Sequence, residues 1–115
     1  MPRLNDPATE AALRGALDDL ILSWPDVSPG RMFGSHAYRV RGVLFAMIGG
    51  EGLVLTKLGE EQRRLAAAEH GAHAFVGHGR ELPGWTEFAL ADGTGVAAVA
   101  SLVRAAYDNA VLEAG

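Results

Sequence analysis

The sequence contains no cysteine, which excludes disulfide bridges, thiolate zinc sites and a cysteine nucleophile. That absence is compatible with a reducing cytosol. Lysine is almost absent as well, because Lys57 is the only lysine among ten basic residues. We interpret this bias toward arginine as a property of the genome rather than of a binding site, so it predicts no particular partner.

No apolar run in the chain is long enough to span a membrane, and no apolar stretch follows the first six residues as it would in a signal peptide. No segment of low complexity stands out, and charged residues make up 21% of the chain, so we do not expect global disorder. We therefore expect a soluble, cytoplasmic protein without a membrane partner.

The residues that are present fit a single domain covering 1–115, because 115 residues with 49% hydrophobic content can form one core. The net charge of −4 argues against a general nucleic-acid-binding protein. Charge is nevertheless uneven along the chain. The stretch 28–57 carries four basic residues and one acid: Arg31, Arg39, Arg41, Lys57 and Glu51. This positive segment leaves a restricted contact with an anion open.

The clearest predicted helix lies near the N-terminus. It follows Asp6, a candidate N-cap, with Pro7 in the first helical position, and it stops before Pro25. Arg14 and Asp18 lie four residues apart, where they are expected to pair weakly. Apolar residues at helical spacing form its core-facing side: Leu13, Leu17, Leu20, Ile21 and Trp24.

Two further helices are predicted. One spans about 60–70, where Leu65 and several alanines form a thin apolar face and Gly71 is placed to end the helix. We expect this helix at the surface of the fold. The other spans about 96–112, with Thr94 as a candidate cap. It has a continuous apolar stripe at helical spacing: Val96, Val99, Ala100, Val103, Tyr107, Ala110 and Val111.

Alternating or apolar runs predict five strands, over 36–40, 43–48, 53–57, 72–76 and 85–89. The first three form a meander, in which Arg41-Gly42 and Gly49 to Gly52 are hairpin turns. We interpret 26–30 as a turn-rich approach and 77–84 as a loop. The order α-β-β-β-α-β-β-α predicts an α+β fold, with helices packed on an antiparallel sheet of about five strands.

Three motifs resemble the TfoX N-terminal-domain family and its relatives of the YjbR (MmcQ) type. Arg-Met-Phe-Gly at 31–34 is similar to the motif that precedes that family's first strand. Gly-Val-Leu-Phe-Ala at 42–46 is similar to its Gly-x-x-Phe-Ala hairpin, and 53–57 to the Leu-x-Leu-Lys-like strand that follows. Residues 79–85 are similar to its Gly-Arg-x-x-x-x-Trp element. The resemblance covers roughly residues 9–112.

The resemblance implies a regulatory role and brings no catalytic residue or cofactor with it. The family is best known as the N-terminal part of regulators of natural competence, and YjbR-type relatives are often described as DNA-binding. The chain ends at Gly115, directly after the third predicted helix. We therefore expect it to lack the helix-rich C-terminal domain of full-length competence regulators, which argues against a direct role in competence.

Metal binding and nucleophilic catalysis have little support in the sequence. His70, His73 and His78 are close in the chain, but they fall on a helix end, an irregular segment and a glycine loop. Zinc needs a more compact set and a fourth ligand. Ser35 beside His36 makes no dyad, because adjacent side chains of a strand point to opposite faces. We expect no metal, no cofactor and no enzymatic activity, and an enzyme built on the histidine loop stays as a third alternative.

The candidate binding residues are basic or aromatic: Arg31, Arg39, Arg41, Arg80 and Trp85. Our first hypothesis is a small non-catalytic module for protein–protein contact or regulation. The alternative is a nucleic-acid-binding regulator in which Arg31, Arg39 and Arg41 contact phosphates. We favour a solvated, edge-guarding strand face over phosphate contact. Because so few cations are present, we expect any nucleic-acid binding to be weak.

We also expect a homodimer. The strand predicted over 43–48 is apolar on both faces, and three helices of which one is thin leave one side of the sheet incompletely covered. Twofold pairing is the commonest way to bury such a surface. Tyr38, Met47 and Trp85 are expected to supply aromatic or soft contact area.

Overall fold

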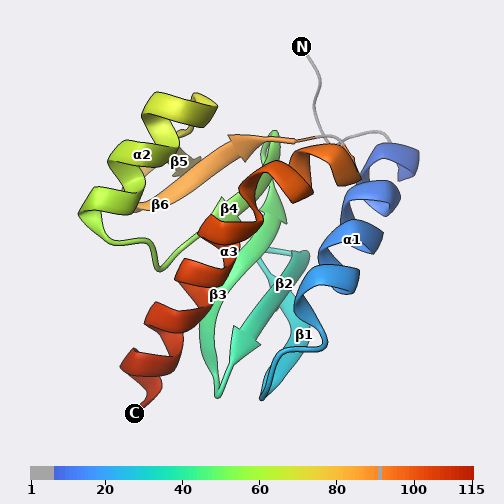
Figure 1. Ribbon diagram of the computed structural model, residues 1–115. Coiled ribbons are helices and arrows are strands. Elements are labelled where there is room, and N and C mark those ends of the chain that lie inside the picture. Colours follow the sequence, from blue (N-terminus) through green and yellow to red (C-terminus); the bar gives the residue numbers. More distant parts are fainter. Residues whose placement is uncertain (1–6, 91) are drawn as a thin grey trace.

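The chain forms three helices and a six-stranded antiparallel sheet in a computed structural model that describes residues 7–90 and 92–115 (Figure 1). The elements in chain order are α1 (Pro7–Ile21), β1 (Val27–Met32), β2 (Ser35–Val40), β3 (Val43–Gly49), β4 (Gly52–Leu55), α2 (Glu60–His70), β5 (His73–Gly77), β6 (Arg80–Ala89) and α3 (Gly93–Ala114). The strands lie in the order β1-β2-β3-β4-β6-β5. The predicted α+β class is confirmed. No helix of the described residues is long and apolar enough to cross a membrane.

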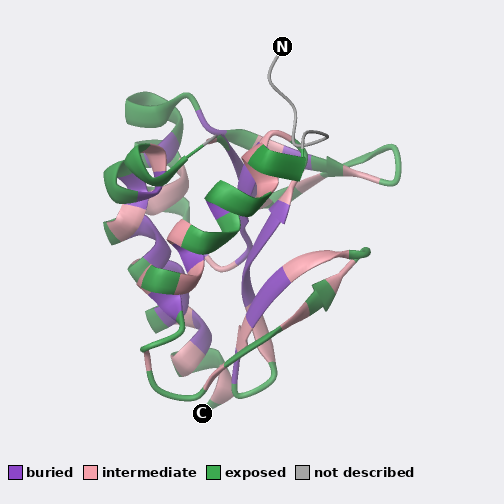
Figure 2. Ribbon diagram, turned by 90° about the vertical axis from the view of Figure 1, so that its right-hand side faces the viewer, coloured by how far each residue is buried: buried purple, intermediate pink, exposed green. Residues whose placement is uncertain are grey.

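All three helices pack into one core on one face of the sheet (Figures 1 and 2). The predicted apolar sides of α1 and α3 point into it, and α2 adds Ala66. A bulge where β2 pairs with β3 directs both Phe45 and Ala46 toward the helices. The fully buried members include Leu13, Leu17, Ile21, Tyr38, Phe45, Val103 and Ala106. The predicted N-cap, Asp6, lies outside the described residues.

A second, smaller core lies on the opposite face of the sheet, and all of its residues belong to strands. Its buried members are Ala37, Met47, Val54 and Phe75, with Met32, Leu44, Leu82 and Trp85 packed against them. Met47 and Val54 face each other across β3 and β4, and both are almost fully buried although no helix residue belongs to this cluster. The sheet therefore covers much of this face by its own curvature. Less apolar surface is therefore left on this face than the expected dimer assumed, and the dimer stays a prediction.

Three of the hairpin turns have the same two-residue design. Phe33-Gly34, Arg41-Gly42 and His78-Gly79 each place both central residues at positive φ, the combination that a type I′ turn requires. Their flanking residues pair in register, as Met32 with Ser35 and Gly77 with Arg80 show. The predicted turn at Arg41-Gly42 is confirmed, and so is the turn between Gly49 and Gly52.

Two stretches predicted to be irregular are strands. The predicted turn over 26–30 lies largely in β1, an edge strand that tolerates Pro29 because one side of an edge needs no ladder hydrogen bond. The predicted loop over 77–84 is a two-residue turn followed by the first half of β6. The loop was predicted because proline and glycine usually mark loops, but Pro83 and Gly84 lie within β6. They lie opposite a register shift between Ala74 and Phe75, where proline is accommodated.

The helix boundaries follow the predicted signals with two exceptions. The first helix ends at Ile21, earlier than the predicted stop at Pro25, so Trp24 lies beyond the helix although it still packs against the helix-side core.

The second helix spans Glu60–His70, and Gly71 ends it in the left-handed conformation at φ 65°. The third helix starts earlier than predicted and is capped by Asp92, not by Thr94. The Asp92 carboxylate accepts from the backbone N–H groups of Thr94 and Gly95, which satisfies two of the open donors of the first turn.

We predict that truncating the helix faces weakens the fold. Leu17→Ala is expected to lower the free energy of unfolding by about 2–4 kcal/mol, and Val103→Ala by about 1–3 kcal/mol, because both side chains are fully buried. Leu22→Ala is the matched control, since Leu22 is 41% exposed and should change stability little. Urea unfolding followed by circular dichroism measures all three. Unchanged stability in both core variants would contradict the helix packing.

Candidate functional site

Two turns from diagonally opposite corners of the sheet meet on its helix-free face. Phe33, in the β1–β2 turn, packs edge-on against His78 in the β5–β6 turn, with ring centroids 4.7 Å apart. The Phe33 ring also lies 5.9 Å from that of Trp85, which stacks on Phe75 at 6.0 Å. We call Phe33, His78 and Trp85 the hairpin-tip surface. This surface lies where the curled sheet closes. Its Trp85 packs against the second core, and its Phe33 is half-exposed to solvent.

Both turn residues of this surface adopt a backbone conformation that their side chains disfavour. Phe33 has φ 53° and His78 has φ 55°, in the left-handed region where asparagine, aspartate and glycine are preferred. Phe33 is also 49% exposed, so the helix-side core does not explain the aromatic ring. Strained backbone and half-exposed aromatic rings are therefore combined at one point of the molecule.

Four of the five predicted binding residues lie in or beside this region. Trp85 is part of the surface, and Arg80 flanks the His78-Gly79 turn. Arg31 Nη1 donates to the Gly34 carbonyl at 2.9 Å, and Arg39 Nη2 donates to the Arg31 carbonyl at 3.2 Å. These two guanidinium groups thus brace the β1–β2 turn.

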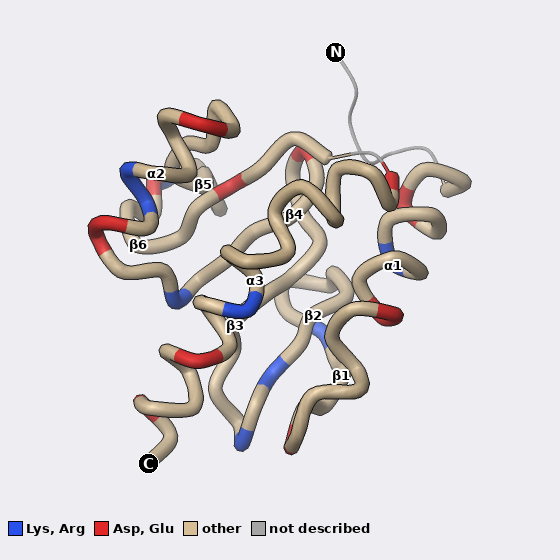
Figure 3. Tube along the Cα trace, viewed as in Figure 1, with Lys and Arg blue, Asp and Glu red and all other residues tan. Residues whose placement is uncertain are grey.

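Arg41 does not join the other arginines. It occupies the β2–β3 turn, at the end of β2 away from Phe33, and its Nε donates to Asp26 Oδ2 at 3.0 Å in an exposed ion pair. Basic and acidic residues are also mixed along the Cα trace of the described part of the fold, so neither kind gathers in one place (Figure 3). The three arginines of the predicted phosphate contact are therefore not brought together.

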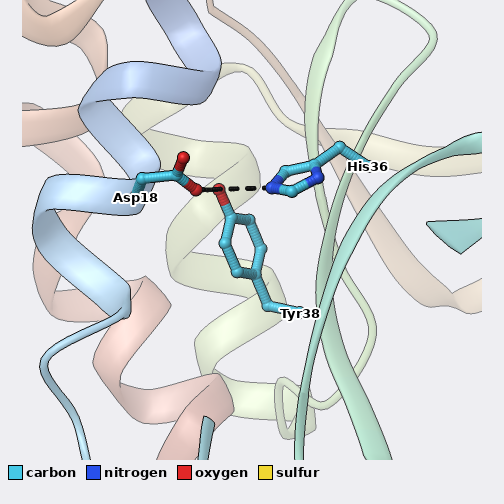
Figure 4. Close-up of polar contacts among 3 residues, drawn as sticks. All are labelled: Asp18, His36 and Tyr38. Carbon is cyan, nitrogen blue, oxygen red and sulfur yellow. Dashed lines mark hydrogen bonds and ion pairs between the residues drawn. The ribbon is translucent and has the colours of Figure 1, made fainter. Parts of the chain in front are cut away.

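A polar cluster on the other face ties α1 to β2. Asp18 Oδ1 accepts a 2.6 Å hydrogen bond from the Tyr38 hydroxyl and lies 3.3 Å from His36 Nε2, and the two rings stand edge to face (Figure 4). The helix spacing predicted that Asp18 pairs with Arg14. In the described residues the Asp18 carboxylate contacts His36 and Tyr38 on β2 instead. Tyr38 and His36 reach it together because they are two apart on one strand.

The chemistry of this cluster is that of a fixed donor and acceptor. Burial raises the pKa of Tyr38 most, and the hydrogen bond to Asp18 raises it further, so the phenol stays protonated and donates. Tyr38 is fully buried, and the His36 side chain is only 15% exposed. We assign the cluster a structural role in orienting α1 on the sheet.

The three clustered histidines of the sequence separate in the structure. His70 faces Phe88, His73 pairs with Glu51, and His78 contacts Phe33. Among residues 7–90 and 92–115 no group of three or more histidine, aspartate or glutamate side chains is arranged to hold a metal ion.

Sequence reasoning did not select Phe33 and His78 as binding residues. A signal was present, because each precedes a glycine in a two-residue hairpin. What the sequence cannot supply is the meeting of the two turns, which lie 45 residues apart in the chain (33 to 78).

Comparisons of the chain with protein-family models, with curated proteins and with solved structures give no match.

We predict that the Asp18–Tyr38 hydrogen bond stabilises the fold. Tyr38→Phe keeps the ring but removes the hydroxyl, and it is expected to lower the free energy of unfolding by about 1.5 kcal/mol, as for hydrogen bonds to charged groups. Asp18→Asn should weaken the same contact, whereas Asp19→Asn on the exposed side of α1 should not. Thermal unfolding compares the variants, and equal stability of Tyr38→Phe and the unmodified chain would contradict this role.

We predict that His73 titrates above the ordinary histidine range. Its hydrogen bond to the Ala74 carbonyl raises the pKa most, and Glu87 and Glu51 raise it further against some desolvation. A raised folded-state pKa stabilises the fold below about pH 6.5, and this contribution is lost as the pH rises through the folded-state value. An NMR titration of the ring protons should show the raised pKa, and Glu51→Gln should lower it. A His73 pKa at or below the ordinary value would overturn the assignment.

Proposed function

We propose that this chain is a non-catalytic interaction module of the TfoX N-terminal type, and that it binds a protein partner through the hairpin-tip surface. The observation that carries the proposal is Phe33, an aromatic residue that is 49% exposed and has φ 53°. The motif at 31–34 that supports the family resemblance contains this residue.

The fold by itself favours a different residue at position 33. A left-handed backbone costs a non-glycine residue roughly 1–2 kcal/mol, and asparagine relieves much of that cost in a type I′ turn. The contacts of Phe33 with His78 and Trp85 return part of this energy but leave the residue 49% exposed. A partner that covers the exposed half supplies the remaining reason for an aromatic side chain here.

The composition of the surface favours a protein partner over a nucleic acid. Aromatic residues and arginine dominate the energetic centres of protein interfaces. Arg31 and Arg39 spend donors on backbone carbonyls, and Arg41 lies in another turn. Arg80 is the only basic residue beside this surface whose side chain has no hydrogen bond or ion pair within the described residues. So few available cations give a small phosphate footprint.

Photocrosslinking tests this surface directly. With p-benzoylphenylalanine in place of Phe33, we expect one discrete protein adduct in cells, and none above background with the same residue in place of Leu112. Leu112 is 79% exposed and serves as the control for exposure alone. Mass spectrometry then identifies the partner, and an adduct of twice the chain mass would make that partner a second copy. Equal, diffuse adducts at both positions would contradict the proposal.

We predict that Phe33→Asn separates binding from folding. Asparagine relieves the backbone cost at φ 53°, and the substitution removes the ring contacts with His78 and Trp85. Because these two effects are of similar size and opposite sign, the free energy of unfolding should change by less than about 1 kcal/mol. The affinity for the crosslinked partner should fall about thirtyfold, as for loss of an interface hot spot worth 2 kcal/mol. Arg41→Asn is the matched control, since Arg41 has φ 52° in the equivalent position of another turn, and it should keep its affinity.

Calorimetry with the purified partner measures both variants. Equal affinities of the two variants would remove the hairpin-tip surface from the interface. Fluorescence anisotropy with labelled single- and double-stranded DNA is run beside it. Tight binding of DNA at physiological salt, lost in an Arg31→Ala, Arg39→Ala double variant, would replace the proposal by the nucleic-acid alternative.

A further inference from the structure

A cavity of about 310 Å³ opens where the β3–β4 turn meets β5 and β6. Its lining residues are Gly50, Glu51, His73, Val76 and Glu87. None of them belongs to the hairpin-tip surface, so an inference about this cavity goes beyond the proposed function. Its walls combine two carboxylates and an imidazole with one apolar side chain.

Glu87 is the unusual group of this cavity, because it is a carboxylate on a central position of β6 that is only 6% exposed. Its Oε2 accepts a 2.6 Å hydrogen bond from the backbone N–H of Glu51. A Cβ on Gly50 would collide with this oxygen, so the turn is shaped around the carboxylate. No Lys or Arg side chain of the described residues forms an ion pair with Glu87.

The second oxygen of Glu87 is available to a ligand. Oε1 has no hydrogen-bond partner within the described residues. In that part of the chain every fully buried side-chain nitrogen or oxygen has a partner, so Oε1 is not fully buried, and Glu87 is one of the residues that line the cavity. A carboxylate oxygen without a donor, on a residue that is only 6% exposed, calls for a cation or a hydrogen-bond donor.

Glu51 and His73 complete a set of three acceptors. His73 Nδ1 lies 3.0 Å from the Ala74 carbonyl, and Nε2 lies 3.6 Å from Glu51 Oε1. A neutral ring that donates from Nδ1 has its lone pair on Nε2, on the side of Glu51. The Glu51 side chain is 19% exposed, and like Glu87 it has no Lys or Arg partner among residues 7–90 and 92–115.

We propose that this cavity binds a primary alkylammonium group, such as a lysine side chain or a small amine. The ammonium carries three N–H donors, which match Glu87 Oε1, the Glu51 carboxylate and His73 Nε2. Val76, on the edge strand β5, is 57% exposed and offers an apolar wall for the methylene stem.

Two other cations fit less well. A guanidinium binds a carboxylate best through both oxygens, and Glu87 Oε2 is already engaged by the Glu51 N–H. A divalent metal needs its ligands at about 2.0–2.6 Å, closer than the roughly 2.9 Å of an N–H···O hydrogen bond, and no group of His, Asp or Glu side chains in the described residues is arranged to hold one. A single compact charge with three donors remains as the class that fits.

An NMR titration of the full chain with n-butylammonium chloride tests the proposal at low ionic strength and at a pH above the raised folded-state pKa of His73, which the ring-proton titration supplies, so that the imidazole is neutral. We expect saturable shifts of the backbone amides of Gly50, Glu51, Val76 and Glu87. Tetramethylammonium, which has no N–H donor, should bind at least about tenfold more weakly. Absence of saturable shifts, or equal binding of the two cations, would overturn the site.

Two variants distinguish binding of the ammonium group in this cavity from unspecific attraction of a cation to a chain of net charge −4. Glu87→Gln should weaken n-butylammonium binding at least about tenfold, since one buried charge is removed. Glu61→Gln is the matched control, because its side chain is 92% exposed on α2 and outside the cavity. Equal weakening in both would contradict a built site.

A second variant protects the test against a folding defect. Glutamine at 87 keeps an oxygen that can accept from the Glu51 N–H, and the amide spectrum shows whether the fold is intact. If Glu87→Gln does not fold, Glu51→Gln makes the same comparison at a more exposed wall of the cavity and should also weaken binding. Unchanged affinity in the folded variant rejects the proposal.

Two ligands distinguish the sources of the ammonium group. One arm uses 1,4-diaminobutane, and the other uses the peptide acetyl-Gly-Lys-Gly-amide. Tighter binding of the peptide identifies a lysine side chain of a protein, and tighter binding of the diamine identifies a free amine. Failure of both ligands to bind overturns the proposal and leaves the hairpin-tip proposal untouched, because that surface shares no residue with the cavity.

Discussion

The structure depends on the meeting of two hairpin turns, Phe33-Gly34 and His78-Gly79, across the helix-free face of the sheet. An open sheet with all helices on one side would leave its other face in water. Here the twist of the strands brings diagonal corners together, and the enclosed face buries Met47 and Val54 almost completely. The cost is two non-glycine residues in the left-handed region, and the burial of a second apolar core offsets it.

This closure explains the strand pattern that the dimer hypothesis had used. A strand that is apolar on both faces needs two apolar surroundings, and β3 finds one under the helices and one inside the curled sheet. The helix side is in turn oriented by Asp18, which binds Tyr38 across 20 positions of the chain. The helix-free face is therefore held by the aromatic contacts of Phe33, and the helix side by the Asp18–Tyr38 hydrogen bond. Both sets of contacts form within one chain.

Both proposed surfaces use the turns of this sheet, because turns project side chains beyond a rigid scaffold. Trp85 and Arg80 were selected from the sequence for their chemistry, and both lie in or beside the proposed hairpin-tip surface. The roles of the other arginines were not predictable, since Arg31 and Arg39 brace a turn through carbonyl groups and Arg41 pairs with Asp26. Because the basic residues are close in the sequence, they suggested one binding face. In the structure the guanidinium groups of Arg31 and Arg39 donate hydrogen bonds to nearby backbone carbonyls.

By itself the sequence determined the class of the fold, the bounds of the second helix and the turn at Arg41-Gly42. Periodicity, glycine and proline act over a few neighbouring residues, so these features can be recognised without a structure. Only the tertiary structure decided that Phe33 meets His78 and that Glu87 is buried against the Glu51 N–H. Those contacts depend on strand order, register shifts and accumulated twist, which join residues far apart in the chain and leave no local pattern.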